Sequence, residues 1–324
     1  MHPVRQAAGS RVRPWLVGAL TVAMLSACGS SATTSSRTGP AGSSTATTQR
    51  PGTGKPPFIL GTKNFTEEFI LGQLYAQALR AKGFSITLKN DLGPSELMDR
   101  KLASRAIDGY PEYTGTILSV FGDQSARPSS AHQAYRLAAA VERGRGAALL
   151  AMASASDTDV VIAKPAYAQQ RRLHSLADLR RLGSAATLTG PPEFKRRFNG
   201  MLGLRQDYGV TALRFLPEQI GEQYRALAGG RAQLAVAFTT DGNLTRGGFA
   251  TLADPKNIFG FQNVTFVVRN GVLAREGPAF AQAINAVSER LSTEALRLMN
   301  AAVSLDQQSP AAVARQFLGA NGLL

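Results

Sequence analysis

Hydrophobic residues recur with two different periods along most of the chain. Short apolar runs predict strands over 58–61, 84–88, 107–110, 155–164, 179–190, 233–238 and 264–268. Apolar residues at helical spacing predict helices over 64–82, 93–105, 131–144, 192–198, 218–227, 278–291, 292–302 and 310–318. Because strands and helices alternate, the pattern predicts an α/β fold with mainly parallel sheets. Ligands of such folds bind at the carboxyl ends of strands, often in a cleft between lobes.

The N-terminal end of the chain follows a different pattern. Basic residues up to Arg13 precede an apolar stretch over 15–27, which is shorter than the roughly 20 residues that span a bilayer as a helix. This order is typical of an export signal, so we expect a signal peptide over residues 1–27. Residues 25–28 (LSAC) resemble the bacterial lipobox, whose cysteine is acylated. The resemblance implies lipid attachment at Cys28; the alternative is an ordinary secretory signal with an incidental cysteine.

The segment after Cys28 has a composition that does not support a core. Residues 29–57 are almost all Gly, Ser, Thr, Pro and Ala, so burial cannot offset the entropy cost of ordering them. We therefore expect residues 28–57 to form a flexible tether with a mean span of about 30 Å. With a lipid at Cys28, the folded part would be extracytoplasmic and anchored to the outer face of the cell membrane.

Composition narrows the function classes. With 44% hydrophobic and 18% charged residues the chain has the apolar material for a core, and its 324 residues suit two lobes. The first 57 residues contribute six basic side chains and no acidic one to the net charge of +14, which leaves +8 dispersed over the remainder. A dispersed surplus does not favour nucleic acid. One cysteine and three scattered histidines favour neither a disulfide nor a metal site, and no cofactor is expected.

Four short motifs lie in order along the folded part of the chain. They are GTKNFTEE at 61–68, YPEYTGT at 110–116, GPPEF at 190–194 and TTDG at 239–242. Together with the C-terminal end at 309–324, they resemble the substrate-binding proteins of osmoprotectant ABC transporters, which bind glycine betaine, choline or carnitine. The resemblance covers nearly all of the chain beyond the expected tether, and it implies a solute-binding lipoprotein of an ABC importer.

The resemblance also implies an architecture and a set of partners. The fold would be α/β and periplasmic-binding-protein-like (type II), with two lobes, a hinge and an interlobe ligand cleft. Lobe 1 would comprise residues 58–157 and 262–324, and lobe 2 residues 158–261. A small ligand would draw the lobes together, and the closed protein, expected to be a monomer, would deliver it to a permease. The permease and ATPase subunits would be separate chains, since the sequence carries no Walker motif.

An anion-binding group is implied by the resemblance at Lys63, Thr116 and Arg197, where the family holds a betaine carboxylate. A lysine charge, a threonine hydroxyl and an arginine fork suit that role. Each residue also has a simpler interpretation. Lys63 could be an exposed loop charge, Thr116 a helix cap, and Arg197 part of a solvated basic run.

The cation end of the site departs from the family. Its members surround a quaternary ammonium with aromatic rings, because a methylated cation has no N–H to donate. Tyr113 and Phe238 match two ring positions, whereas Asp159 and Gln262 stand where the family has tyrosines.

The two polar side chains that stand in place of tyrosines change the chemistry expected of the ligand. A carboxylate at Asp159 and an amide at Gln262 favour a ligand with hydroxyl or N–H groups. The alternative to betaine or choline is therefore a polyphenol or an amine, for uptake or for sensing. Phe259 or Phe261, beside Gln262, could instead restore a ring.

The competing class is an exported enzyme, for example a hydrolase built on Asp241 or on the pair Glu67 and Glu68. The chain has no G-x-S-x-G motif and no histidine beside a candidate nucleophile. Acidic residues at the start of a helix usually act on the helix dipole. We therefore expect no enzyme, and a sensory protein without transport is the other alternative.

Overall fold

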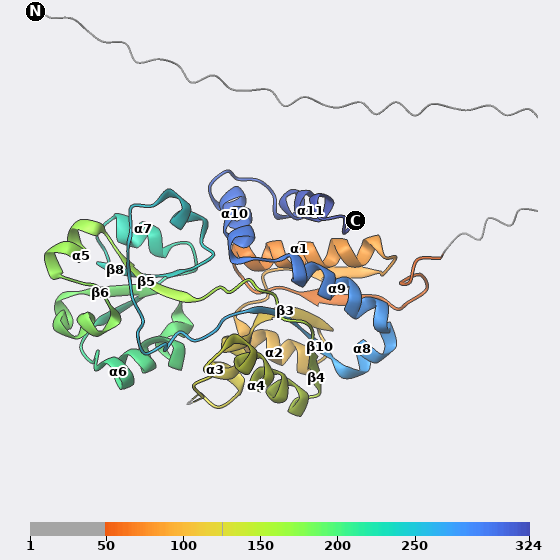
Figure 1. The fold of residues 1–324 in the computed structure, drawn as a ribbon, viewed down its shortest axis with the longest axis horizontal. Helices are drawn as coiled ribbons and strands as arrows, with labels where there is room; N and C mark the ends of the chain where they lie inside the picture. The colour runs from red at the N-terminus through yellow and green to blue at the C-terminus, as the bar shows by residue number, and fades with distance from the viewer. Residues whose placement is uncertain (1–48, 125) are drawn as a thin grey trace, which may run out of the picture. The chain divides into compact units, whose positions relative to one another are not determined.

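The computed structural model describes residues 49–124 and 126–324, and Figure 1 shows two β-sheets with helices packed on them. The expected signal peptide, Cys28 and most of the expected tether lie outside these residues. Near the start of the described part, Gly52 donates a backbone hydrogen bond to the carbonyl of Lys82 at 2.9 Å. No helix within the described residues is both long enough and apolar enough to cross a membrane.

The first sheet has five strands in the order β2-β1-β3-β10-β4. Their bounds are β1 Phe58–Gly61, β2 Ile86–Lys89, β3 Gly109–Tyr113, β4 Ala147–Leu149 and β10 Val264–Arg269. Strand β1 pairs in parallel with β2 and β3, whereas β10 is antiparallel to both β3 and β4. The chain therefore returns to this sheet after it has built the second one.

Helices cover both faces of the first sheet (Figure 1). One face packs against α1 (Thr66–Ala81), α9 (Pro278–Arg290), α10 (Thr293–Ser304) and α11 (Pro310–Ala320). The other face packs against α2 (Ser95–Ala103), α3 (Thr114–Phe121) and α4 (Ala131–Gly144), and α8 (Asn270–Glu276) follows β10. Helix α1 lies at the centre of the larger core because Ile70, Leu74 and Leu79 recur at helical spacing and are fully buried.

The second sheet also has five strands, in the order β7-β6-β8-β5-β9. Their bounds are β5 Asp159–Ala163, β6 Thr187–Gly190, β7 Arg214–Pro217, β8 Leu234–Phe238 and β9 Ala250–Leu252. Strand β6 is parallel to β7 and β8, whereas β5 is antiparallel to β8 and β9.

The helices of the second sheet are short. A larger core lies under α5 (Pro165–Arg171) and α6 (Gly203–Tyr208), and a smaller one under α7 (Gln223–Ala228). Short helical segments fill the connections. They are 3-10 helices at Leu176–Arg181, Gly183–Ala185, Pro192–Lys195 and Gly242–Arg246 and a π turn at Phe198–Leu202. Much of this part of the chain is therefore held by packing rather than by long helices.

The chain crosses between the two sheets twice, once before β5 and once before β10. At the crossings Ser156 pairs with Asn263 in an isolated antiparallel bridge, and Asp157 N donates to Gln262 O at 2.9 Å. All described residues belong to one compact unit, in which we name the parts built on the first and second sheets the first and second lobe. Two paired crossing segments are the kind of connection about which two lobes can rotate.

The expectation of mainly parallel sheets is wrong, because each sheet is mixed. Strands β10 and β5 run antiparallel to their neighbours. Both strands are entered directly from a crossing segment and not through a β-α-β connection, so the rule that makes such connections parallel does not apply to them. The sequence pattern also missed β4, β7, β9, α3, α5, α6 and α8, which are too short to show a period.

Glu142 on α4 offers a test of packing in the first lobe. Its side chain is buried, its Oε1 has no hydrogen-bond partner among the described residues, and burial raises the pKa of the carboxyl to about 7. The stability that protonated Glu142 contributes is present below pH 4.5 and is lost as pH rises through 7.

Glu142→Gln is therefore expected to raise the free energy of unfolding by about 1–2 kcal/mol at pH 8, and to change it little at pH 5. Urea unfolding at both pH values measures the difference. The exposed Glu289→Gln is the matched control. Equal effects of Glu142→Gln at the two pH values would contradict the assignment.

Candidate functional site

A pocket lies where strand ends of the two sheets face each other, and all seven residues predicted to bind ligand line it. They are Lys63, Tyr113, Thr116, Asp159, Arg197, Phe238 and Gln262. Because β5 and β10 are antiparallel to their neighbours, their starts lie at the same edges as the ends of β8 and β3. The cavity measures about 60 Å³.

Lys63 follows β1 and is an internal ion-pair partner, not an exposed loop charge. Its Nζ donates to Glu112 and lies 3.4 Å from Glu68 Oε1, and both carboxylates are fully buried. The ammonium also lies 4.1 Å from the ring centroid of Tyr113. Burial raises the pKa of Glu68 to about 8, so Glu112 is the principal counter-charge of Lys63 at neutral pH.

Gln262 holds Thr116 and does not offer its amide to the ligand space. Its Oε1 accepts hydrogen bonds from Thr116 N at 2.9 Å and Thr116 Oγ1 at 3.2 Å, and its Nε2 donates to Phe259 O at 3.3 Å. Thr116 lies inside the first turn of α3 and not at its cap. Gly115 permits this approach, because a Cβ there would come within 2.7 Å of Phe261 O.

Arg197 joins the two lobes through a two-pronged ion pair. Its Nε and one terminal nitrogen donate to the two carboxylate oxygens of Glu96 at 3.3 and 2.9 Å, and Glu96 lies on α2 of the first lobe. Partial burial favours the protonated form of Glu96, but the hydrogen bonds and charge of Arg197 outweigh burial and lower its pKa. Arg197 is therefore not the solvated surface charge that its basic run suggests.

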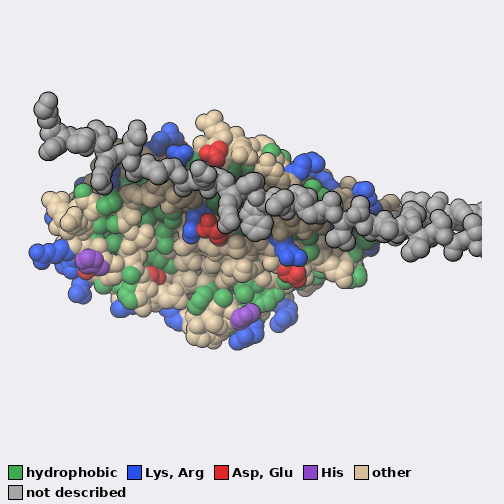
Figure 2. Space-filling view, turned by 45° about the horizontal axis from the view of Figure 1, so that its top comes forward, with side chains coloured by type: hydrophobic (Ala, Val, Ile, Leu, Met, Phe, Trp, Pro, Cys, Tyr) green, Lys and Arg blue, Asp and Glu red, His purple; other side chains and the backbone are tan. Residues whose placement is uncertain are grey.

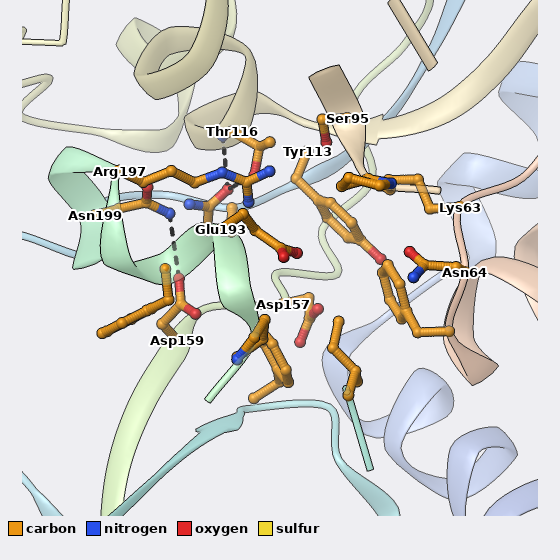
Figure 3. A pocket seen from close by; sticks show the side chains of 17 residues that line it. Lys63, Asn64, Ser95, Tyr113, Thr116, Asp157, Asp159, Glu193, Arg197 and Asn199 are labelled. Carbon is orange, nitrogen blue, oxygen red and sulfur yellow. Dashed lines mark hydrogen bonds between the residues drawn. The ribbon is translucent and has the colours of Figure 1, made fainter. Parts of the chain in front are cut away.

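Three carboxylates line the pocket without an ion-pair partner among the described residues, namely those of Asp157, Asp159 and Glu193. Figure 3 shows Asp157 and Glu193 reaching into the pocket, with Asp159 beside Asn199. Asp159 Oδ2 accepts a hydrogen bond from Asn199 Nδ2 at 3.2 Å, and Asp157 Oδ1 accepts one from Thr240 Oγ1 at 2.5 Å. The free acceptors of the pocket thus outnumber its free donors.

Burial raises the pKa of both aspartates. The pKa of Asp159 reaches about 7, and the charge of Arg197 together with the Asn199 hydrogen bond limits the rise. The pKa of Asp157 lies well above its usual range because of burial and the nearby charge of Glu67. A cation in the pocket would favour the ionised forms, so ligand binding can be coupled to proton release.

Four aromatic side chains also line the pocket, those of Phe65, Tyr113, Phe194 and Phe238. Phe65 and Tyr113 stack with their ring centroids 6.4 Å apart, and the Tyr113 hydroxyl donates to Glu67 Oε1 at 2.8 Å. Phe259 and Phe261, expected as replacement rings, line a neighbouring cavity of about 300 Å³. A ligand in this pocket would therefore lie beside the rings of Phe65, Tyr113, Phe194 and Phe238.

The acidic residues considered as catalytic groups have structural partners. Glu67 and Glu68 lie in the first turn of α1, as expected, but both are buried and therefore do more than act on the dipole. Glu67 Oε2 accepts from Asn300 at 2.6 Å, and Asp241 Oδ2 accepts from the Tyr224 hydroxyl at 2.6 Å. Within the described part of the chain, no group of three His, Cys, Asp or Glu side chains is arranged to hold a metal.

The sequence interpretation missed several lining residues. Phe65 and Glu193 lie inside two of the recognised motifs, and Asp157 is two positions before Asp159, so a signal for them existed. Asn199 lies in a π turn beyond the third motif, and nothing in the local sequence marks it. Glu96, which occupies Arg197, is 101 residues away from it in the sequence. Tertiary packing alone brings that pair together.

Basic side chains are spread over the face in Figure 2 and do not form one stripe. The figure also shows acidic side chains among them. A continuous basic surface of the kind that tracks a nucleic-acid backbone is therefore not seen on this face.

Known proteins resemble this chain in sequence and in fold. Residues 56–320 match the family model of the substrate-binding domain of ABC-type glycine betaine transport systems. A glycine-betaine-binding protein of Pseudomonas aeruginosa is 31% identical over 276 residues, which are 82% of this chain and 88% of the relative. The glycine betaine-binding protein YehZ of Escherichia coli is 28% identical over 286 residues, with 82% and 91% covered.

Solved structures show the same two-lobed arrangement. Apo YehZ from Escherichia coli aligns with a TM-score of 0.58 at 26% identity, over 83% of this chain and 99% of that one. A structure described as a glycine betaine/carnitine/choline ABC transporter aligns with a TM-score of 0.65 at 21% identity, over 82% and 99%. The second likeness is one of fold.

Proposed function

The chain belongs to the family of substrate-binding domains of ABC-type glycine betaine transport systems, and from that premise we propose that it captures a small ammonium solute for import. The observation that carries this proposal is the pocket between the lobes, which four rings and three carboxylates line. Rings attract a methylated cation through their quadrupoles, and carboxylates attract it through their charge. The family is one of transport proteins and not of enzymes.

Glycine betaine and choline are the first ligands to consider, because the relatives of this chain are named for betaine binding. The acidic lining of the pocket favours a cation over a polyphenol. Separation of the two lobes would open this pocket to a solute.

The hinge would supply that separation. The crossing segments at Ser156 and Asn263 are the covalent links between the lobes, and the pocket lies beside them. A ligand that contacts both lobes stabilises the closed state by its differential affinity for that state. Closed substrate-binding proteins of this family deliver the ligand to a permease, which with its ATPase would be formed by separate chains.

We extend the proposal to the N-terminal part of the protein on its sequence alone. Cys28 would carry the lipid, residues 28–57 would be the tether, and residues 1–27 would be removed as the signal peptide. The folded part would then work as a monomer at the outer face of the cell membrane.

Calorimetric titration of the mature protein with glycine betaine and choline tests the proposal. Phe238→Leu keeps the bulk of the side chain and removes the ring, so it should weaken binding of a trimethylated ligand about 3- to 10-fold. Phe238→Tyr retains the ring and is the matched control. Absence of binding for both ligands, or equal losses in the two variants, would count against the proposed function.

A further inference from the structure

The groups expected to hold a ligand carboxylate are already engaged by the protein itself. The three pairings are Lys63 with Glu112, Arg197 with Glu96, and Thr116 with Gln262. Two of the three partners are carboxylates, so each of the two cations already has an internal counter-charge. The third partner is an amide oxygen, which accepts the threonine hydroxyl as a carboxylate oxygen would.

These pairings differ in how readily a ligand could replace them. Glu112 is fully buried, so a ligand that took Lys63 would leave a buried carboxylate without its counter-charge, which is strongly unfavourable. The Glu96 side chain is 37% exposed and could return to water. Of the two cations, Arg197 is thus the one that could change partner. A ligand carboxylate would then replace the carboxylate of Glu96, and the binding free energy gained would be small.

The acceptors of the pocket, in contrast, are open to a ligand. Asp157, Asp159 and Glu193 have no ion-pair partner among the described residues. Asn199 donates its amide nitrogen to Asp159, but its Oδ1 is buried without a hydrogen-bond partner, and Asn199 is only 7% exposed. A buried acceptor without a donor is costly, and a trimethylammonium group has no N–H to supply one.

On the basis of the proposed function, we propose that the pocket selects a small organic cation with N–H or O–H donors and no carboxylate, such as a protonated amino alcohol, over methylated zwitterions. The cation would lie among the rings and the carboxylates of Asp157, Asp159 and Glu193. Its donors would bond the carboxylate oxygens of these three residues. Arg197 would keep Glu96, and Lys63 would keep Glu112.

Four ligands separate the two parts of this proposal. Choline and N,N-dimethylethanolamine lack a carboxylate, whereas glycine betaine and N,N-dimethylglycine carry one. Protonated dimethylethanolamine and dimethylglycine each have an N–H donor, which choline and glycine betaine lack. Calorimetric titration of the mature protein at pH 7.5 should show that dimethylethanolamine binds at least threefold more tightly than choline. Choline should bind at least tenfold more tightly than glycine betaine. A reversal of either order overturns the proposal.

A variant tests the cause of the discrimination. Glu96→Gln releases Arg197, so it should tighten glycine betaine at least tenfold and leave choline within threefold of the parent protein. Asp99→Asn is the matched control, because Asp99 lies on the same helix and pairs with Arg145 outside the pocket. No gain for betaine in Glu96→Gln would overturn the view that an internal carboxylate excludes that of the ligand.

The outcomes also separate this inference from the proposed function. Betaine that binds as tightly as choline or tighter, with a loss in Phe238→Leu, would leave the proposed function intact and overturn the inference alone. If none of the four ligands bound, both the inference and the proposed function would be overturned.

Discussion

Replacing Lys63 with methionine is expected to lower the free energy of unfolding by about 3–5 kcal/mol at pH 7.5. The reason is that Lys63 is 3% exposed and supplies the positive charge opposite the fully buried Glu112. Removal of one partner of a buried pair leaves the other charge without compensation. A lysine that served only to meet a ligand would cost little stability when replaced. Denaturant unfolding without ligand makes the measurement.

The double variant Lys63→Met/Glu112→Gln is the control for this prediction. It removes both charges, so it should recover most of the lost stability even though it has one more substitution. A loss below about 1 kcal/mol in Lys63→Met would show that Lys63 is free to bind a ligand. The engaged donors of the pocket would then no longer explain discrimination against zwitterions.

Asp159 is expected to make choline binding strengthen roughly tenfold between pH 6 and pH 8. Its pKa of about 7 in the free protein means that the ionised form, which attracts a cation, increases over this range. Arg197 stays charged throughout, burial raises the pKa of Asp157 as well, and Glu193 faces the same space. Asp159→Asn should remove this pH dependence and weaken choline by about 2 kcal/mol, roughly 30-fold.

Calorimetry in two buffers with different ionisation enthalpies measures both parts of this prediction. A bound cation lowers the pKa of Asp159, so binding at pH 7 should release a fraction of a proton, and the observed heat should depend on the buffer. The exposed Asp306→Asn is the control. Binding that weakens toward pH 8, or that keeps its pH dependence in Asp159→Asn, would contradict the role of this carboxylate.

The position of the pocket could be predicted from the sequence to a large extent. Lys63, Tyr113 and Thr116 lie in motifs that follow or end strands, and the ends of neighbouring strands lie at one edge of a sheet. Asp159 and Phe238 lie opposite each other in the register of β5 and β8. Local patterns therefore indicated which residues would gather.

The state of those residues could not be predicted in the same way. Whether Arg197 is free depends on Glu96, and whether Lys63 is free depends on Glu112, which is 49 residues away. Such pairs follow from the packing of distant elements and leave no spacing in the sequence. The amide of Gln262 was expected to face the ligand, but it accepts a hydrogen bond from Thr116. This contact, too, is not marked by any spacing in the sequence.

The fold showed a similar division between long and short elements. The long helices α1, α4, α9, α10 and α11 have enough turns for an apolar stripe to be recognised, and the structure has them close to the predicted ranges. The run over 179–190 was expected to be one strand. Its first part instead forms 3-10 turns, and only Thr187–Gly190 joins the sheet. A capping box of Ser175 and Asp178 begins the first of these turns.

The ion pair between Arg197 and Glu96 also bears on the rates of binding. Since both partners of this pair belong to the protein, it stabilises the closed form of the free protein. A solute would then enter only when the lobes open. The observed association rate should then level off at high solute concentration, at the rate of opening. Added salt weakens a partly exposed ion pair and should raise that plateau. The ion pair would thus lower the rate of ligand capture and keep the population of open, ligand-free molecules small.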